Sequence, residues 1–271
     1  MASRSEWLVR RLCDHGSSGL RMNLLKGHLL AMRAHFEQVL VLTYALPESS
    51  LRPLLPPGLL LDTFEGYGFL AIAMVQTRNM RPAFAPRIFG RGFFLTGYRL
   101  FTRYQTRSGR VLRGLRILRS DTDSEFMVRW GNRLTHYGYR KAAVSYDRRG
   151  DLLEIATRST AGEADLHVRA HLTADAADLP ESSPFPDLQV ARKFAGPLPF
   201  TFDYDAETHS IIRVQGMRGV WDPKPVRVDV LQNTFIAKEP FAKAKPVLAS
   251  AFQLANVDYQ WKRGISEVLS D

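Results

Sequence analysis

Apolar and polar residues alternate with a period of two along most of the chain, as in β-strands that bury one face. Clear examples are QVLVLTYALP at 38–47 and AFQLANVDYQW at 251–261, and a further strand is predicted for the strongly apolar run at 69–77. Turn residues rich in Gly, Pro, Asn and Asp separate these runs. The pattern predicts a mainly β protein, either a sandwich or a closed barrel with a few covering helices.

Helical periodicity is confined to short segments. The segment 124–134 predicts an amphipathic helix, and we expect Asp121 or Asp123 to cap it rather than to act in catalysis. A second short helix is predicted at 187–194. The segment 79–92 is rich in Pro, Gly and Arg, and as a loop of more than about 12 residues it is long enough for a lid or pocket wall.

The chain shows no repeat of fixed period, so we predict one domain over residues 37–271. Residues 1–36 are interpreted as an N-terminal extension, partly helical and partly flexible around the Gly-Ser-Ser-Gly run at 16–19. Cys13 is the only cysteine, which excludes an intrachain disulfide. No secretory signal and no apolar run of about 18 residues is seen. We therefore expect a cytoplasmic protein without a membrane partner.

The net charge of +10 comes from 37 Lys and Arg against 27 Asp and Glu. Such a charge attracts nucleic acid, but the arginines are spread along the chain and no helix-turn-helix, zinc-finger or RNP motif accompanies them. We expect an anionic small molecule instead. The alternative is a non-catalytic module whose basic surface meets an acidic partner or nucleic acid. A homo-oligomer is compatible with either interpretation.

Sequence motifs for common cofactors are absent: there is no HExxH, CxxC, P-loop or GxGxxG. His167 and His171 would share one face of a strand but lack a third ligand, so we expect no metal and no cofactor. A G-x-S-x-G elbow is also missing, which leaves lysine as the candidate for covalent catalysis.

The stretch RWGNRLTHYGYRKAAVSYD, which ends a predicted helix and begins a predicted strand, concentrates candidate chemistry. His136, Tyr137 and Tyr139 can transfer protons or donate hydrogen bonds to a carboxylate. Lys141 would become a Schiff-base nucleophile if burial beside cations kept its amine neutral. The alternative is a solvated strand lysine beside aromatic residues that close a core with their polar ends outward.

Several arginines also lie within the two strand-like runs at 93–106 and 111–120. If the second strand is regular across Gly114, strict alternation places Arg113 and Arg119 on the opposite face from Arg116.

The chain from roughly Gln38 to Trp261 resembles the acetoacetate decarboxylase-like superfamily, most closely its bacterial branch of uncharacterised proteins of unknown function. The matching pieces are LRPLLPPGLLLDTFEGYGFLAIAMVQTRNMRP at 51–82, GYRLFTRYQT, GLRILRSDTD, LTHYGYRKAAV and the W-x-P-x-P at 221–225. The resemblance implies a closed, mostly antiparallel β-barrel or cone with a central cavity and helices on its rim.

In the decarboxylases, a Gly-Tyr-Pro-Lys-Lys segment carries the Schiff-base lysine, followed by a second lysine that depresses its pKa. Gly138-Tyr139-Arg140-Lys141-Ala142 falls on this segment. Lys141 takes the place of the nucleophile, whereas Ala142 replaces the second lysine. A glutamate of the superfamily falls on Tyr98. The decarboxylation machinery is therefore incomplete, and we do not transfer that activity.

What the resemblance implies for this chain is a small anionic or carboxylate-bearing molecule in the central cavity, with Schiff-base or lyase-type chemistry left open. Arg116 would pair with the anion, and Lys141 would serve as nucleophile or second cation. The residues predicted to line the cavity are Tyr98, Arg116, His136, Tyr139 and Lys141.

Overall fold

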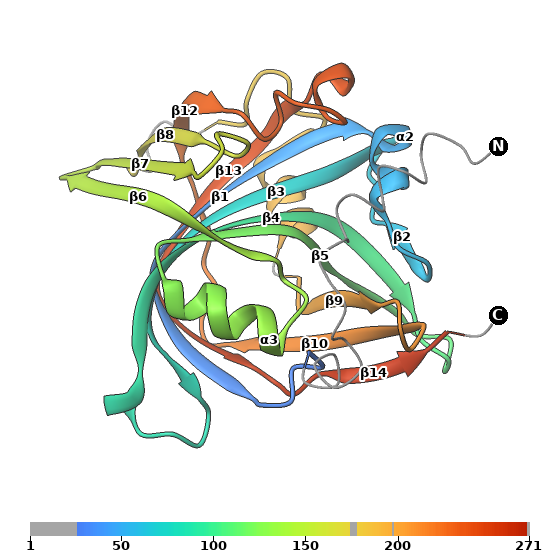
Figure 1. Ribbon diagram of the computed structural model, residues 1–271. Helices are drawn as coiled ribbons and strands as arrows, with labels where there is room; N and C mark the ends of the chain where they lie inside the picture. Colours follow the sequence, from blue (N-terminus) through green and yellow to red (C-terminus); the bar gives the residue numbers. More distant parts are fainter. Residues whose placement is uncertain (1–25, 174–177, 197, 270–271) are drawn as a thin grey trace.

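The computed structural model describes residues 26–173, 178–196 and 198–269. The expected flexible run at 16–19 and Cys13 lie outside the described residues. Within the described part of the chain, fourteen strands belong to one hydrogen-bonded sheet, shown in Figure 1. The prediction of a mainly β protein is confirmed.

Seven strands of this sheet close into a ring, because β4 pairs with β5 as well as with β3. Neighbouring strands of the ring are antiparallel except β5 and β9, which are parallel. The predicted closed, mostly antiparallel barrel is therefore confirmed. In ring order the strands are β1 (Met32–Pro47), β3 (Tyr67–Pro82), β4 (Arg91–Gln105), β5 (Val111–Thr122), β9 (Phe200–Asp205), β10 (Ser210–Arg218) and β13 (Val247–Trp261).

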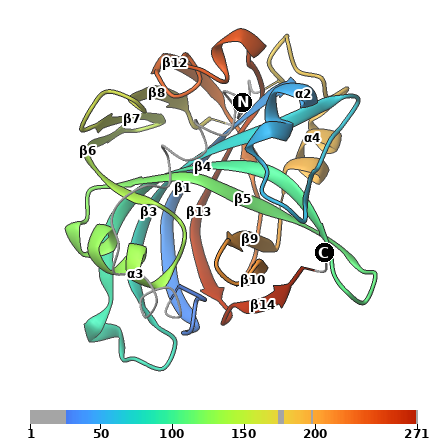
Figure 2. The same cartoon turned by 45° about the vertical axis from the view of Figure 1, so that its right-hand side comes forward.

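Four further strands form an arm that leaves the ring where β6 pairs in parallel with β5. The arm lies beside β1, β3 and β4 at the upper left of Figures 1 and 2. It consists of β6 (Tyr139–Arg149), β7 (Leu152–Ser159), β8 (Leu166–His171) and β12 (Arg227–Asn233). Short edge strands are β2 (Leu59–Leu61) on β4, β11 (Lys224–Pro225) on β13 and β14 (Ile265–Val268) on β10.

The helical segments are short, and in the described residues none is long and apolar enough to cross a membrane. They are α2 (Glu48–Leu51), η2 (Arg52–Leu54), η3 (Arg87–Phe89), η4 (Met127–Gly131), α3 (Asn132–Leu134), α4 (Leu188–Ala195) and η6 (Ala242–Ala244). Both predicted helices are thus present. Asp187 caps α4 by accepting a hydrogen bond from the Val190 backbone N–H at 2.7 Å.

The prediction that Asp121 or Asp123 caps the helical segment containing η4 is wrong. Ser124, rather than an aspartate, accepts from the backbone N–H of Met127 at 3.3 Å. Asp123 instead accepts from the backbone N–H of Phe94 at 2.8 Å, and Asp121 pairs with Arg119. Asp123 is thus used by a long-range contact with β4, and Asp121 by a contact with an arginine two residues before it on β5.

Two predicted boundaries also shift. β1 already begins at Met32, inside the segment interpreted as an N-terminal extension. The predicted loop at 79–92 is shorter than expected and is confined to residues 83–90, because β3 continues to Pro82 and β4 starts at Arg91. Long-range pairing of β1 with β13 and of β3 with β4 extends these strands beyond their apolar runs.

The strands β1, β3 and β4 are covered on both faces, which explains their long apolar runs. On the outer face, Leu42, Ile72 and Tyr98 share a core with Ile155 and Val168 of the arm. The inner face has its own core, in which α4 packs at one end of the ring; this core contains Phe69, Ala71, Phe101, Ala191 and Phe252. Each fully buried large apolar side chain contributes about 1.5–3 kcal/mol.

A β-bulge between β4 and β5 decides where the strand arginines point. Tyr98 pairs with Arg119, Arg99 with Ile117 and Leu100 with Arg116, so β5 has one extra residue. As a result Arg116 and Arg119 lie on the same face of β5. The prediction that alternation separates them is wrong, because a bulge interrupts the period of two.

Candidate functional site

Four neighbouring strands bring polar groups into one row across the inner face of the ring. Arg99 pairs with Ala71, Ala71 with Thr43, and Thr43 with Ser250. Paired residues of antiparallel strands project to the same side of the sheet. The hydroxyl oxygens of Thr43 and Ser250 are buried and have no hydrogen-bond partner among the described residues. Such orphaned polar groups are rare in folded proteins.

Arg99 is the charged member of this row. Burial lowers the pKa of its guanidinium, and the side chains that oppose this effect are Tyr259, Tyr137 and Tyr139, none of which is a carboxylate. Its Nε has no hydrogen-bond partner among the described residues, yet part of the side-chain surface remains accessible. A cation held this deep normally needs an anionic partner.

Two glycines leave space for these side chains. A Cβ at Gly97 would lie 2.9 Å from Nε of Arg99, so the guanidinium lies over this glycine. A Cβ at Gly216 would overlap the hydroxyl of Tyr259. The missing side chains on β4 and β10, which lie on opposite sides of the ring, therefore leave room inside it for a guanidinium and a phenol.

Tyr137 and Tyr139 enter the ring from the junction between α3 and β6. Asn132 fixes this junction, because its side chain donates to the carbonyl of Tyr139 at 2.8 Å and accepts from its N–H at 2.7 Å. Burial raises the pKa of Tyr137, Tyr139 and Tyr259. All three therefore remain neutral hydrogen-bond donors at ordinary pH.

Arg116 and His136 lie at a neighbouring acidic group. Arg116 donates to Oδ1 of Asp203 at 3.0 Å, and Nε2 of His28 lies 3.3 Å from the other carboxylate oxygen. Burial lowers the pKa of His136, with Asp203 opposing that shift. Arg116 thus already has a carboxylate partner within the protein.

Tyr98 lies on the outer face of β4, where it packs against Phe235 with ring centroids 4.2 Å apart. Its hydroxyl donates to the carbonyl of Ala164 at 3.0 Å, and burial raises its pKa. This position connects β4 to the loop between β7 and β8.

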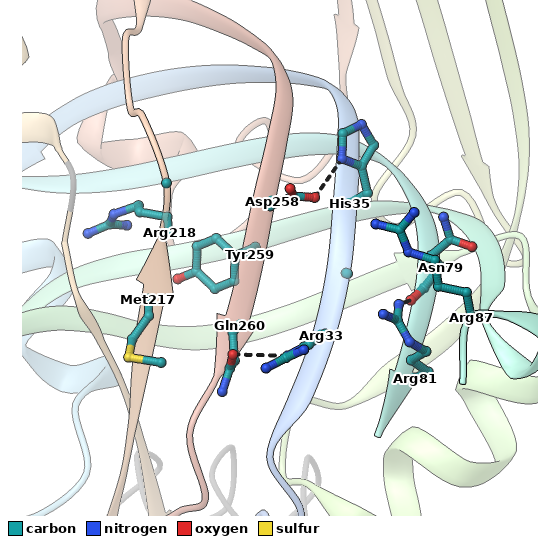
Figure 3. A pocket seen from close by; sticks show the side chains of 12 residues that line it. Arg33, His35, Asn79, Arg81, Arg87, Met217, Arg218, Asp258, Tyr259 and Gln260 are labelled. Atoms are coloured by element: carbon teal, nitrogen blue, oxygen red, sulfur yellow. Dashed lines mark hydrogen bonds and ion pairs between the residues drawn. The ribbon is translucent and has the colours of Figure 1, made fainter. Parts of the chain in front are cut away.

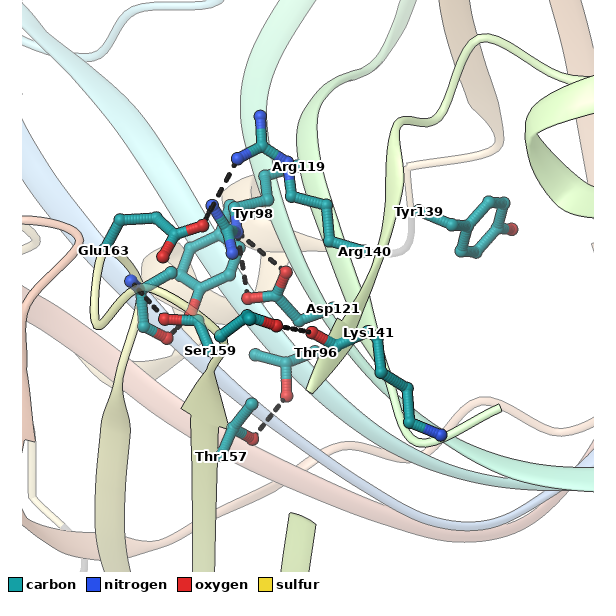
Figure 4. A network of polar contacts seen from close by, with 12 residues as sticks. Thr96, Tyr98, Arg119, Asp121, Tyr139, Arg140, Lys141, Thr157, Ser159 and Glu163 are labelled. Atoms are coloured by element: carbon teal, nitrogen blue, oxygen red, sulfur yellow. Dashed lines mark hydrogen bonds and ion pairs between the residues drawn. The ribbon is translucent and has the colours of Figure 1, made fainter. Parts of the chain in front are cut away.

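Beside Tyr98, Arg119 binds two carboxylates of a polar network shown in Figure 4. It donates to Asp121 at 2.7 Å and to Glu163 at 2.9 Å. Burial raises the pKa of Asp121 to about 6 although Arg119 opposes the shift. The contacts within this network are internal to the protein, which indicates a structural role.

Lys141 points away from Tyr139 in Figure 4. Its ammonium donates to the backbone carbonyl of Asp123 at 2.7 Å and lies 3.3 Å from Glu125, with 44% of the side chain exposed. A Schiff-base lysine is helped by burial beside other cations. The neighbours of Lys141 are instead a carbonyl and a carboxylate.

The structure therefore distributes the predicted site residues over four places. Tyr139 lies near Arg99, Arg116 and His136 lie at Asp203, and Tyr98 and Lys141 occupy separate positions. Sequence reasoning did not select Arg99, Thr43, Ser250 or Tyr259. One usable signal is Thr43, the one threonine within the apolar run QVLVLTYALP.

The described part of the chain contains no group of three or more His, Cys, Asp and Glu residues arranged to hold a metal ion. His167 and His171 contact carboxylates of neighbouring strands, Glu154 at 2.6 Å and Asp229 at 3.3 Å.

The sequence matches the family DUF2071, described as an uncharacterized conserved protein, over residues 33–255. The chain belongs to this family. A search among curated proteins returns no match.

Solved structures similar to the DUF2071 chain share the acetoacetate decarboxylase fold. Acetoacetate decarboxylase from Legionella pneumophila is 13% identical, with a TM-score of 0.55 over 88% of this chain and 87% of that one. An acetoacetate decarboxylase-like enzyme from Sphingomonas wittichii is 14% identical, with a TM-score of 0.58 over 95% of this chain and 100% of that one. The enduracididine biosynthesis enzyme MppR complexed with pyruvate is 14% identical, with a TM-score of 0.54 over 88% and 91%.

Proposed function

We propose that the DUF2071 chain binds a small organic carboxylate inside the ring, with Arg99 as the counter-ion. The observation that carries this proposal is the Nε of Arg99, which has no hydrogen-bond partner in the described part of the chain, on a side chain that keeps accessible surface deep inside the fold. A carboxylate matches the planar fork of a guanidinium and can accept two parallel hydrogen bonds from it.

The remaining groups of the row would hold the rest of the ligand. Thr43 and Ser250 add hydroxyls that are unpaired among the described residues; both are fully buried, so a ligand reaches them only when the side chains that cover them move. The buried tyrosines near Arg99 offer neutral donors for a carbonyl or hydroxyl oxygen. One cation surrounded by neutral donors favours a ligand with one carboxylate and a second, uncharged oxygen. Oxo acids have this composition.

The fold relatives support the same class of ligand. MppR is described as complexed with pyruvate, a 2-oxo acid, and two other similar chains are acetoacetate decarboxylases by name. Their low identity shows a common fold and not a common reaction. Pyruvate and acetoacetate are therefore the first ligands to test, not established substrates.

Schiff-base chemistry on Lys141 stays a prediction that rests on the match to the Gly-Tyr-Pro-Lys-Lys segment. For Lys141 to take part, its amine would have to leave Glu125 and the carbonyl of Asp123. Borohydride reduction in the presence of pyruvate tests this directly. A mass increase mapped to Lys141, and lost in Lys141→Met, would support catalysis.

The binding proposal is tested by thermal unfolding of the protein with pyruvate, with acetoacetate, and with acetone as a neutral analogue. Ligand that binds the folded state raises the unfolding temperature by mass action. We expect the unfolding temperature to rise with the two carboxylates but not with acetone. This rise should be lost in Arg99→Gln. It should remain in the control variant Arg140→Gln, because the Arg140 side chain is half exposed and lies elsewhere. Equal responses of the wild type and Arg99→Gln would contradict the proposal.

A further inference from the structure

The hairpin between β3 and β4 carries exposed apolar side chains at its end. We call residues 83–90 the hairpin tip. In it Phe84 is 80% exposed, Ile88 87% and Phe89 69%. The hairpin projects at the lower left of Figures 1 and 2, away from the arm. Grouped apolar side chains of this size at a protein surface usually mark an interaction site.

Hydrogen bonds hold the hairpin tip in a fixed shape. Nε of Arg81 donates to the carbonyl of Ala85 at 3.0 Å, and Nη1 of the same guanidinium donates to the carbonyl of Asn79 at 2.9 Å. The N–H of Phe89 donates to the carbonyl of Pro86 at 3.1 Å. The apolar side chains are therefore presented outward by an ordered turn.

The same hairpin is strongly basic. Residues 77–92 include four arginines and no Asp or Glu. Beside the tip lies a pocket of about 630 Å³, lined by Arg33, Arg81 and Arg87 among others and shown in Figure 3. The one carboxylate in its lining is Asp258, which contacts Nδ1 of His35 at 2.9 Å. The pocket thus offers several guanidiniums to an external anion.

A second exposed apolar group adjoins the hairpin on the segment that contains η4. Phe126 is 41% exposed and Trp130 is 45% exposed. The guanidinium of Arg91 lies 4.3 Å from the ring centroid of Phe126, which joins this segment to the hairpin. Arg133 stacks in the same way over Trp130 at 5.2 Å. Aromatic rings beside arginines are common where proteins meet the membrane–water interface.

We propose that this end of the ring docks reversibly on an anionic membrane surface. Phe84, Ile88 and Phe89 would enter the boundary between headgroups and acyl chains, while the arginines of the hairpin and pocket meet lipid phosphates. Apolar insertion and attraction to anionic lipid together give stable peripheral binding. This docking involves no membrane-spanning segment and does not depend on the proposed carboxylate site.

The chemistry of this surface argues against two other partners, a second copy of the chain and a nucleic acid. In a symmetric dimer through this patch, the arginines of one copy would face those of the other, and like charges oppose such an interface. A nucleic acid would satisfy the arginines but would leave the aliphatic Ile88 without an apolar partner. An anionic lipid surface satisfies both the charge and the apolar side chains.

The test is co-sedimentation of the full chain with vesicles of phosphatidylglycerol and phosphatidylcholine, compared with vesicles of phosphatidylcholine alone. We expect binding to the anionic vesicles that weakens as salt rises. The triple variant Phe84→Ser, Ile88→Ser, Phe89→Ser should reduce the partition coefficient about tenfold or more. The double variant Arg33→Gln, Arg87→Gln should reduce binding to anionic vesicles only.

Matched controls exist at the opposite end of β4. Leu60 is 61% exposed and Val111 59% exposed, so Leu60→Ser, Val111→Ser removes exposed apolar surface elsewhere and should leave binding unchanged. Wild-type protein that stays in the supernatant with anionic vesicles would overturn the proposal. So would a hairpin-tip variant that binds like the wild type, or self-association of the wild type that only this variant abolishes.

Discussion

Tyr98 and Arg99 are adjacent in the sequence, yet their side chains lie on opposite faces of β4. Tyr98 packs in the outer core beneath the arm, whereas Arg99 lies among the tyrosines inside the ring. The hydroxyl of Tyr98 donates a hydrogen bond to the protein, whereas Nε of Arg99 has no hydrogen-bond partner among the described residues. This contrast separates a structural residue from a candidate ligand-binding residue.

The first prediction concerns this pair. Tyr98→Phe removes a buried hydrogen bond to Ala164 and should lower the free energy of unfolding by about 1–3 kcal/mol, without changing carboxylate binding. Arg99→Met removes a buried cation without a carboxylate partner in the described residues, so the ligand-free protein should be as stable as the wild type or more stable. Chemical denaturation of both variants checks the prediction. A destabilised Arg99→Met with unchanged ligand binding would show that Arg99 is structural.

The second prediction compares two fully buried threonines on opposite faces. The hydroxyl of Thr96 lies 2.9 Å from that of Thr157, whereas that of Thr43 is unpaired among the described residues. Thr96→Val should therefore cost about 1–3 kcal/mol, and Thr43→Val should be neutral or stabilising. Thr43→Val should also weaken ligand binding. Equal losses of stability in the two variants would mean that Thr43 has an internal partner.

The third prediction uses the glycine beneath Arg99. In Gly97→Ala the new Cβ would lie 2.9 Å from Nε of Arg99 and displace the guanidinium. Because this side chain is long and flexible, we expect little loss of stability. A carboxylate should bind at least tenfold more weakly, since a shifted guanidinium loses one of two parallel hydrogen bonds. Calorimetric titration with pyruvate measures the change, and Gly219→Ala, where a Cβ meets open space, is a control for glycine replacement.

The fourth prediction concerns pH. Burial lowers the pKa of His136 in the folded protein below the usual value of 6.5. As the pH falls below about 6.5, the unfolded chain takes up a proton at this position before the folded protein does. The free energy of unfolding should therefore decrease as the pH falls below about 6.5. In His136→Gln this decrease should be smaller, as measured by denaturation between pH 5 and 8. Identical pH profiles would contradict the prediction.

Several features of the fold follow from the sequence by itself. The period of two in QVLVLTYALP and the strongly apolar run at 69–77 predict strands, and the segments at 124–134 and 187–194 predict helices, because these patterns reflect local backbone geometry. The resemblance of the matching motifs to a known family supplied the closed barrel. These predictions depend on neighbours along the chain or on the family as a whole.

The site required the tertiary structure. Thr43 faces Ser250 only because β1 pairs with β13 from the far end of the chain, and alternation defines two faces of a strand without saying what covers each one. The bulge between β4 and β5 then decides which arginines share a face with Tyr98. Whether a polar atom is satisfied depends on such distant partners. Only the folded ring therefore separates Arg99, whose Nε has no partner among the described residues, from Arg116 and Arg119, which have carboxylates.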